Sequence, residues 1–384
     1  MARRFNSLMN AGHLTGLCCA CALTLTLANP IFAGDEPQYE FGDIRISQAS
    51  SAEPIRKRLS ARKAATYLDQ GAGAWYGTRK CISCHTNGTY MLVRPALTAQ
   101  LGRPSEEVRN NFVTALKDLA SLKRDELLKS TRPAQVIYAA AGLAEWDAHL
   151  TKSLSPETQQ ALKLMFEIQL PTGTWGSADC WPPYESDAFH LATVAAIAVA
   201  DAPGWLTDLK QPSLSAAVTR LKHYLRTQSP PHDYGRVLLL WTSTKMPGLL
   251  DKAQQQEIVE MIFKHQQADG GWSIRTFATP EAWGCGNRSQ KLRSEPEFTR
   301  PPSDGHQTGM AIVALRGAGV PAADPRIQRG LTWLVKNQRA SGRWWTRSLN
   351  TDRQHFITYS GTAFPLLALS LCNALPVDTA DKAK

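Results

Sequence analysis

The sequence has few runs of basic residues and few long apolar stretches. The first shortage argues against a nucleic-acid-binding protein, and the second argues against a membrane-spanning one. Lys and Arg are scattered along the chain, although the formal net charge is +10. Because neither a basic stripe nor an RNA-binding signature is present, we do not expect nucleic acid as a partner. Acidic partners or a membrane surface with acidic lipid headgroups account for the positive charge at least as well. With 43% hydrophobic and 20% charged residues, the chain has the composition of a globular protein.

An apolar segment near the N-terminus, from Leu14 to Leu27, is too short for a confident membrane span. It follows the basic residues Arg3 and Arg4 and precedes Ala33, an order typical of a secretory signal peptide cleaved after Ala33. We therefore expect a periplasmic or secreted protein with no transmembrane helix in its mature chain. The expected organisation is a signal peptide over 1–33, a flexible segment over 34–52, one domain over 53–376 and a disordered tail over 377–384.

A seven-residue pattern, Q-x-x-x-G-x-W, recurs along the chain. It occurs as QLPTGTW (169–175), QQADGGW (266–272) and QRASGRW (338–344). A degenerate copy, DQGAGAW (69–75), has Asp69 where Gln would fall. Each copy follows an amphipathic segment, so each glycine can end a helix and turn the chain toward a second helix.

The second helix of each pair is more apolar than the first, as expected of buried helices. Amphipathic helices are expected near about 54–69, 105–128, 155–170, 211–228, 249–268 and 325–340. Their apolar partners are expected near about 84–101, 133–148, 186–201, 232–246, 304–318 and 356–374. This alternation predicts an all-α (α/α)6 toroid of about six helical hairpins, with the apolar helices lining the inside.

The repeated pattern resembles the QW repeat of squalene–hopene cyclases and related prenyltransferase-like toroids. The most specific stretch is GHQTGMAIVALRGAGVPAADPRIQRGLTWLVKNQRASGRWW (305–345). The resemblance implies that Gln and Trp tie neighbouring repeats together, so Trp175, Trp272 and Trp344 are expected to be packing residues. Class II triterpene cyclases use an Asp-x-Asp-Asp acid, whereas this sequence offers only a faint echo in YESDAF (184–189). The metal ligands of protein prenyltransferases are not matched either, so the resemblance extends to the fold and not to cyclase chemistry.

One motif has no counterpart in that resemblance. Cys81, Cys84 and His85 form C-x-x-C-H, the spacing that attaches a c-type haem, with His85 as the iron ligand. A redox disulfide would fit C-x-x-C, but the thioredoxin-like context is missing. Zinc would need two further ligands, and the expected mature chain after Ala33 has no second C-x-x-C and no H-x-x-x-H.

The motif therefore predicts one covalent haem c in an exported protein. The expected function is electron transfer, with a periplasmic redox partner, or a haem-linked redox reaction. The alternative is a cyclase-like enzyme or a binding protein for a small isoprenoid or other apolar ligand.

In consecutive hairpins, every inner helix begins on the same rim of the toroid, where polar residues gather. Asp187, Asp233 and Asp304 are candidate catalytic residues, although each also suits a helix N-cap. Ring closure favours His355 as a second iron ligand, while His190 and His306 could also reach across. The expected lining of this mouth is Asp187, His190, Asp233, Tyr234, Asp304, His306, His355 and Tyr359.

Three cysteines remain in the expected mature chain outside the haem motif. Cys180 and Cys285 fall in loops on the same rim, and an exported protein can keep a disulfide between them. Cys372 lies in an apolar helical run and is expected to be an inert buried thiol.

Overall fold

The computed structural model describes residues 36–177, 182–184, 187–283 and 288–376, which belong to one compact unit, Glu36–Lys384. The expected signal peptide, the expected C-terminal tail, Cys180 and Cys285 lie outside the described residues.

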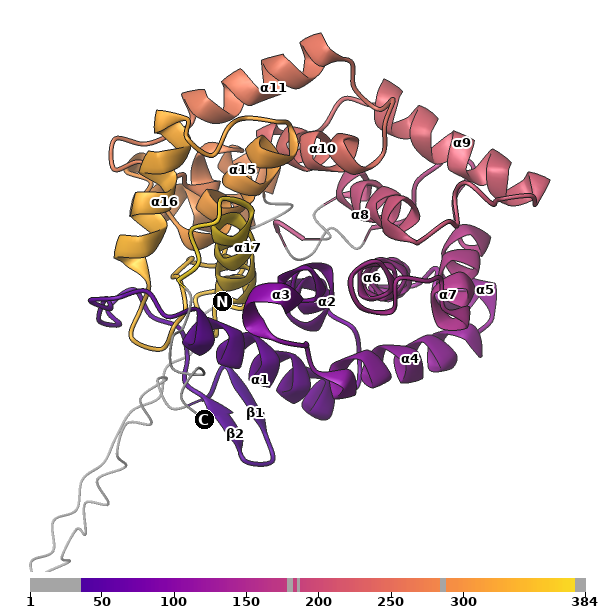
Figure 1. Ribbon diagram of the computed structural model, residues 1–384, viewed down its shortest axis with the longest axis horizontal. Coiled ribbons are helices and arrows are strands. Elements are labelled where there is room, and N and C mark those ends of the chain that lie inside the picture. Colours follow the sequence, from indigo (N-terminus) through magenta and orange to yellow (C-terminus); the bar gives the residue numbers. More distant parts are fainter. Residues whose placement is uncertain (1–35, 178–181, 185–186, 284–287, 377–384) are drawn as a thin grey trace, which may run out of the picture. The chain divides into compact units, whose positions relative to one another are not determined.

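Helices of the described residues form two concentric rings (Figure 1). The outer ring consists of α1 (Ala61–Arg79), α4 (Glu106–Ala120), α7 (Pro156–Glu167), α9 (Pro212–Thr227), α11 (Lys252–Lys264) and α16 (Pro325–Asn337). The inner ring consists of α2 (Thr89–Val93), α6 (Arg132–Trp146), α8 (Ala188–Asp201), α10 (Asp233–Lys245), α15 (Gly305–Gly317) and α17 (Ile357–Leu371). The predicted all-α toroid of six helical hairpins is confirmed.

Shorter elements connect these helices or precede them. They are strands β1 (Tyr39–Phe41) and β2 (Ile44–Ile46), π-helices η1 (Cys84–Gly88) and η3 (Asp147–Thr151), 3-10 helices η2 (Pro95–Leu97) and η4 (Ile274–Thr276), and α-helices α3 (Thr98–Leu101), α5 (Arg124–Leu127), α12 (Pro280–Trp283), α13 (Arg288–Ser294) and α14 (Pro296–Thr299).

The inner ring closes by direct helix contacts, in the order α2, α6, α8, α10, α15, α17 and back to α2. Its helices are apolar around most of their circumference, so they can be buried on all sides. Glycines allow the closest approach, between α15 and α17. A Cβ atom on Gly309 would lie 2.5 Å from the Pro365 nitrogen, and one on Gly305 would lie 2.4 Å from the Gly361 carbonyl oxygen. Only glycine therefore fits at these two positions.

The tryptophans of the three complete repeats are fully buried packing residues, as expected. Each indole N–H donates to a carbonyl of the preceding outer helix: Trp175 to Met165 (2.8 Å), Trp272 to Ile262 (2.7 Å) and Trp344 to Leu334 (2.7 Å).

The repeat glutamines join each repeat to the next outer helix. Gln169 donates to the Ala217 carbonyl (3.1 Å) in α9, and Gln266 donates to the Arg326 carbonyl (2.8 Å) in α16. Gln338 donates to the carbonyl of Ser60 (2.9 Å), the N-cap of α1. This last bond joins the final repeat to the first and helps to close the ring.

The degenerate repeat copy was expected to be a turn, but residues 69–75 lie inside α1. The glycine of this copy, Gly73, lies within the helix, and a Cβ atom there would meet nothing within 4 Å, so it neither reverses the chain nor makes a close contact. The neighbouring Gly71 is the one that packs closely, because a Cβ atom there would meet the Tyr359 ring at 2.8 Å. The helix ends instead at Lys80, whose φ of 53° places it in the left-handed region.

The expected inner helix near 84–101 is broken into η1, α2, η2 and α3. Pro95 contributes to the break because it has no backbone N–H to donate.

The segment expected to be flexible, 34–52, contains an antiparallel hairpin in which Tyr39 pairs with Ile46. The Tyr39 side chain anchors the hairpin because it is buried against the rings of Tyr67, Phe356 and Tyr359. Residues 36–52 therefore include a hairpin that packs an aromatic side chain into the toroid.

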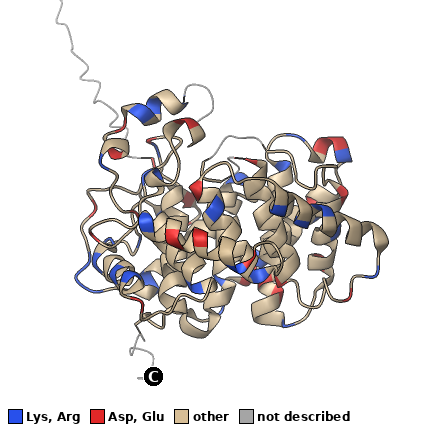
Figure 2. Cartoon of the chain, turned by 90° about the horizontal axis from the view of Figure 1, so that it is seen from above, with Lys and Arg blue, Asp and Glu red and all other residues tan. Residues whose placement is uncertain are grey.

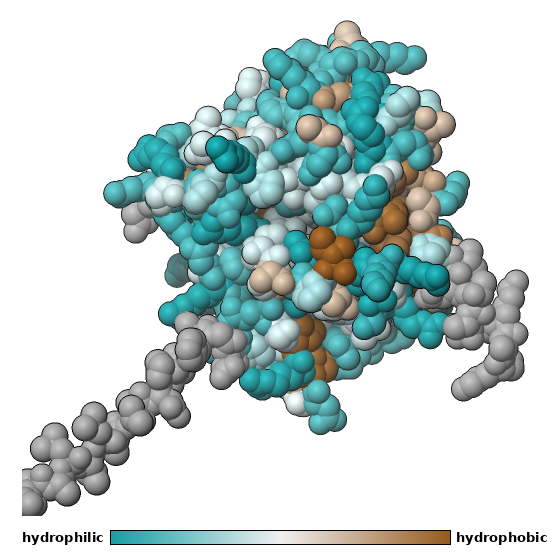
Figure 3. All heavy atoms as spheres, turned by 90° about the vertical axis from the view of Figure 1, so that its left-hand side faces the viewer, coloured by the Kyte–Doolittle hydropathy of each residue, from teal (hydrophilic) through white to brown (hydrophobic). Residues whose placement is uncertain are grey.

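Basic and acidic residues are interspersed over the surface in Figure 2. The face in Figure 3 is mainly hydrophilic, with separated hydrophobic patches. Within the described part of the chain, no helix combines the length and apolar character needed to cross a membrane.

Candidate functional site

The C-x-x-C-H motif lies in and just before η1, where the chain enters the inner ring. The Ser83 side chain caps this π-helix by accepting from the Thr86 N–H (3.2 Å). The Asn87 side chain accepts from the Ser83 N–H (2.7 Å) and donates to the Cys81 carbonyl (3.1 Å). Cys81 is half-buried and Cys84 is buried. Hydrogen bonds between the backbone and the side chains of Ser83 and Asn87 therefore hold both cysteines and the following histidine in one turn.

His85 is held by a hydrogen-bond chain on one side of its ring. Its Nδ1 lies 2.9 Å from the Thr86 hydroxyl, which lies 2.9 Å from the Tyr39 hydroxyl. The ring stacks on Phe356 at 5.1 Å and meets Trp75 edge-on at 4.7 Å between centroids. Burial lowers the pKa of His85 to about 3, so the imidazole is neutral at neutral pH.

These features fit an iron-binding histidine. Metal-ligating histidines usually engage their second ring nitrogen in a hydrogen bond, which fixes the ring and its tautomer. With Nδ1 engaged by Thr86, Nε2 is the nitrogen of His85 suited to ligation.

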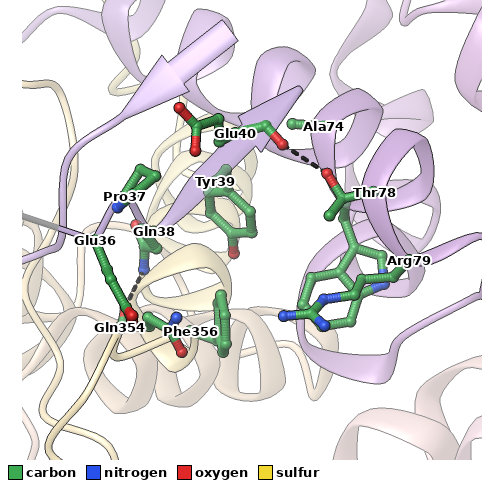
Figure 4. Close-up of a pocket in the computed structure, with 11 residues that line it drawn as sticks. Glu36, Pro37, Gln38, Tyr39, Glu40, Ala74, Thr78, Arg79, Gln354 and Phe356 are labelled. Atoms are coloured by element: carbon green, nitrogen blue, oxygen red, sulfur yellow. Dashed lines mark hydrogen bonds between the residues drawn. The ribbon is translucent and has the colours of Figure 1, made fainter. Parts of the chain in front are cut away.

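A pocket of about 340 Å³ adjoins the motif on the side of the β-hairpin (Figure 4). Trp75 and Phe356, the two rings in contact with His85, are part of its lining, together with Tyr39 and Arg79. Aromatic walls suit the flat apolar faces of a porphyrin, and a guanidinium suits its carboxylate side chains. The lining is thus of a kind that suits a porphyrin, and it reaches His85 through Trp75 and Phe356, since Cys81, Cys84 and His85 are not themselves lining residues.

Tyr184 brings three histidines together in the interior of the toroid. Its ring centroid lies 6.5 Å from that of His85, 6.0 Å from that of His190 and 5.8 Å from that of His306. Burial raises the pKa of the Tyr184 hydroxyl above its ordinary value, so the phenol stays protonated. The interior next to the motif is therefore a neutral cluster of histidine and tyrosine rings.

Two of these histidines are hydrogen-bonded to tyrosines. His190 Nε2 lies 2.9 Å from the Tyr138 hydroxyl, and His306 Nε2 lies 3.1 Å from the Tyr234 hydroxyl. The other ring nitrogen of His306 is 2.7 Å from the Ser360 hydroxyl. Burial lowers the pKa of His190 to about 4 and that of His306 to about 3. The structure thus places His190, Tyr234 and His306 of the expected mouth close to His85, with Tyr184 between them.

The three candidate catalytic aspartates occupy structural positions. Asp187 is the N-cap of α8 and accepts from the His190 N–H (2.7 Å). Asp304 is the buried N-cap of α15 and accepts from the backbone N–H groups of Gln307 (2.9 Å) and Ile274 (2.7 Å). Burial raises the pKa of Asp304 to about 6.

Asp233 begins α10, and its carboxylate contacts His265 Nε2 at 2.9 Å and Arg236 at 3.2 Å. The helix-capping interpretation therefore describes Asp187 and Asp304, and Asp233 serves an ion-pair network.

His355 and Tyr359 pack away from the position expected for them. The His355 ring lies against Trp345 at 4.6 Å, and its Nδ1 accepts from the Ser348 N–H (3.2 Å). The following residue, Phe356, takes the place next to His85. Tyr359 is fully buried and donates to the Leu68 carbonyl (2.5 Å). The structure therefore gives no support to His355 as a second iron ligand.

Sequence reasoning missed Trp75, Tyr184 and Phe356, whose rings surround His85. Trp75 had been noted only as part of a degenerate repeat, and Tyr184 only as part of a faint acidic motif. Their placement depends on the path of loops, for which the hydrophobic pattern gives no signal. Among the residues that the structure describes, no group of three or more His, Cys, Asp or Glu side chains is arranged to hold a metal ion.

A second pocket, of about 270 Å³, lies at the opposite end of the inner ring. Five of the inner helices, α2, α6, α10, α15 and α17, contribute to its lining near their C-terminal ends. Its apolar wall consists of Leu92, Ala96, Trp241, Val313, Leu367 and Leu371.

Charged groups lie on one side of this distal pocket. The Lys245 ammonium contacts Glu145 at 2.8 Å and Asp201 at 2.5 Å, and Glu145 also contacts His149 at 3.1 Å. Burial alone would raise the pKa of Glu145, but the Lys245 ammonium lowers it below its ordinary value. Burial, followed by the charge of Glu145, raises the pKa of Asp201 to about 8. The Lys245 ammonium thus lies between two carboxyl groups, one with a lowered pKa (Glu145) and one with a raised pKa (Asp201).

Comparison with known proteins gives one family match and several similar solved structures. Residues 232–374 match the squalene-hopene cyclase C-terminal domain family. Among solved structures, the chain is similar to the type II terpene cyclase MstE from Scytonema. The apo enzyme shares 13% sequence identity, with a TM-score of 0.44 and coverage of 82% of this chain and 100% of that chain. A variant of MstE in complex with geranylgeranyl dihydroxybenzoate gives 13% identity, a TM-score of 0.44 and coverage of 82% and 96%. No curated protein matches the sequence of this chain.

The residues that match the squalene-hopene cyclase domain include α10, α15, α16 and α17. The chain is thus an α/α toroid whose residues 232–374 match that family, and the C-x-x-C-H motif lies outside the matched residues.

Proposed function

We propose that this chain is an exported protein that carries one haem c, attached to Cys81 and Cys84 and ligated by His85, on a terpenoid-cyclase-like toroid. The observation that carries the proposal is the state of His85. Its Nδ1 is engaged by Thr86, its ring is held between Trp75 and Phe356, and it follows two cysteines within one turn. An ordinary packing histidine would not require that pair of cysteines.

The haem would supply reversible one-electron transfer when bound. Around it, Trp75 and Phe356 would exclude water from one side of the motif, and Arg79 would pair with a carboxylate of the porphyrin. Thr86 and Tyr39 would hold the His85 ring in one orientation and tautomer. The basic net charge suits an acidic periplasmic redox partner, because opposite charges speed encounter.

Haem staining of a denaturing gel tests the proposal, with protein matured in a host that attaches c-type haem. The unaltered protein should stain, and the double variant Cys81→Ala, Cys84→Ala should not. Cys372→Ala is the matched control, because this thiol lies at the end of α17, outside the motif. An unaltered protein that does not stain would refute the haem assignment.

A second candidate function, the binding of a small apolar molecule, is favoured by the distal pocket. Its wall is apolar, and it lies at the centre of the inner ring. Since the sequence has no Asp-x-Asp-Asp acid, we assign binding and not cyclisation to this pocket. Titration of the intact mature protein with 1-octanol in a calorimeter tests it, and the filling variant Ala96→Phe should remove the binding.

A further inference from the structure

The size of the distal pocket sets the size of its occupant. A cavity of about 150 Å³ lined by apolar side chains can hold benzene. The distal pocket has about 270 Å³, roughly twice that volume. A chain of about eight carbons with a small head group fits this space, and a long isoprenoid would have to extend beyond it.

The polar side of the pocket offers hydrogen-bond donors in excess of acceptors. Lys245 has three ammonium hydrogens, and two point to Glu145 and Asp201. Arg316 donates from Nε to the Leu371 carbonyl (3.3 Å) and from Nη1 to the Val320 carbonyl. Both side chains line the pocket, and a guanidinium has five donors in total.

The charged side chains of the lining also include more cations than anions. Lys245 and Arg316 are both cations, and Glu145 is the acid among the lining residues. Asp201 lies behind Lys245 and is not one of the lining residues, and burial, followed by the Glu145 charge, raises the pKa of its carboxyl. His149 lies beside Glu145 at the edge of the pocket. The polar side therefore carries one more positive than negative charge, which favours an anionic head group.

We infer that the distal pocket binds a small amphipathic carboxylate, with its apolar chain against Trp241 and Leu367 and its carboxylate at Arg316 and Lys245. This inference rests on the second candidate function, binding of an apolar molecule, and adds the chemical class of the head group. It is independent of the haem, because the C-x-x-C-H motif precedes the N-terminal end of the inner ring and this pocket lies at the C-terminal end.

Calorimetric titration of the unaltered mature protein with octanoate, 1-octanol and octylammonium at neutral pH tests the inference. Octanoate should bind with one-to-one stoichiometry and at least about tenfold more tightly than octanol, since a hydrogen bond to a charged group contributes about 1.5–3 kcal/mol. Octylammonium should bind most weakly. Because this comparison needs no variant, it is decisive even if a substitution disturbs folding.

Two variants then locate the site. Arg316→Gln should weaken octanoate about tenfold and leave octanol unchanged, because it removes a charged donor and little apolar surface. Arg103→Gln, an exposed arginine paired with Glu106, is the matched charge control and should change neither. Ala96→Phe should abolish binding of both probes. Circular dichroism should confirm that each variant is folded.

The outcomes separate the two proposals. Octanol or octylammonium binding as tightly as octanoate, in a way that Ala96→Phe abolishes, would overturn the carboxylate and leave the pocket as an apolar site. An unchanged octanoate affinity in folded Arg316→Gln would also overturn the head-group assignment. If none of the three probes binds, the second candidate function fails together with the inference.

Discussion

Gln338 carries the hydrogen bonds through which the last repeat closes the toroid on the first. It donates to the carbonyls of Ser60 (2.9 Å) and Gly342 (2.8 Å) and accepts from the Ser60 N–H (2.8 Å). Replacement by Ala removes all three bonds. The Gly342 carbonyl is in a fully buried bond, so leaving it without a partner costs about 1–3 kcal/mol. The two bonds to Ser60 are partly buried and contribute about 0.5–1.5 kcal/mol each. We therefore expect Gln338→Ala to lower the free energy of unfolding by about 3 kcal/mol.

Gln266→Ala is the matched comparison, because Gln266 donates to the corresponding two carbonyls, those of Gly270 and Arg326, and accepts its third bond from the exposed Arg329 side chain. Water can replace its bonds more easily, so its loss should cost about 1.5 kcal/mol. Urea denaturation of the mature protein, followed by circular dichroism, measures both. A Gln338→Ala effect no larger than that of Gln266→Ala would refute the reasoning from burial and ring closure.

Three further predictions concern the inner ring. Gly309→Ala should lower the free energy of unfolding by about 1–3 kcal/mol because its Cβ atom would overlap α17. The control Gly73→Ala should not lower it, because a Cβ atom there meets nothing within 4 Å. Equal denaturation midpoints for the two variants would contradict the packing argument. Burial raises the pKa of Asp304 to about 6 in the folded state, so between about pH 4 and 6 the folded protein holds a proton that the unfolded chain has lost. The free energy of unfolding should therefore fall as the pH rises from about 4 to 6. The variant Asp304→Asn should lack this pH-dependent component in denaturant titrations, and an identical pH profile would oppose it. Lys245→Met should cost roughly 3–5 kcal/mol because Glu145 would remain buried without its cation, whereas a cost under about 1 kcal/mol would show that the pair is effectively solvated.

The toroid could be predicted from the sequence because its two kinds of helix alternate regularly along the chain. Alternating amphipathic and apolar segments placed the outer and inner helices, and glycine with tryptophan marked the turns between them. The same signal failed at residues 69–75, since Gly73 and Trp75 of that copy lie inside α1, and a glycine followed by a tryptophan does not by itself distinguish a helix interior from a turn. It also failed at the β-hairpin, whose order depends on the contacts of Tyr39 with rings far along the chain.

The candidate site could be predicted only where it is local in sequence. Cys81, Cys84 and His85 lie within five residues, so spacing alone defines that motif. The topological argument placed His190 and His306 on the same rim because both begin inner helices, and in the structure both rings pack against Tyr184, which also packs against His85. It could not distinguish His355 from Phe356, which are adjacent in the chain. His355 has a positive φ of 43°, and that local turn directs Phe356 toward His85.

The distal pocket was not predicted, because its residues come from the far ends of five helices. Lys245, Glu145 and Asp201 meet across three helices and share no sequence motif. Only the assembled ring shows that they lie together.

The intact mass of the protein, purified from a host that exports it and attaches c-type haem, tests the central claim most directly. One mass spectrum under denaturing conditions shows both whether the N-terminal segment has been cleaved and whether a group is bound covalently. The account predicts the mass of residues 34–384 plus one haem, with the haem lost from the mass of the Cys81→Ala, Cys84→Ala variant. A polypeptide mass without haem, from a host shown to mature another c-type cytochrome in the same experiment, would contradict it.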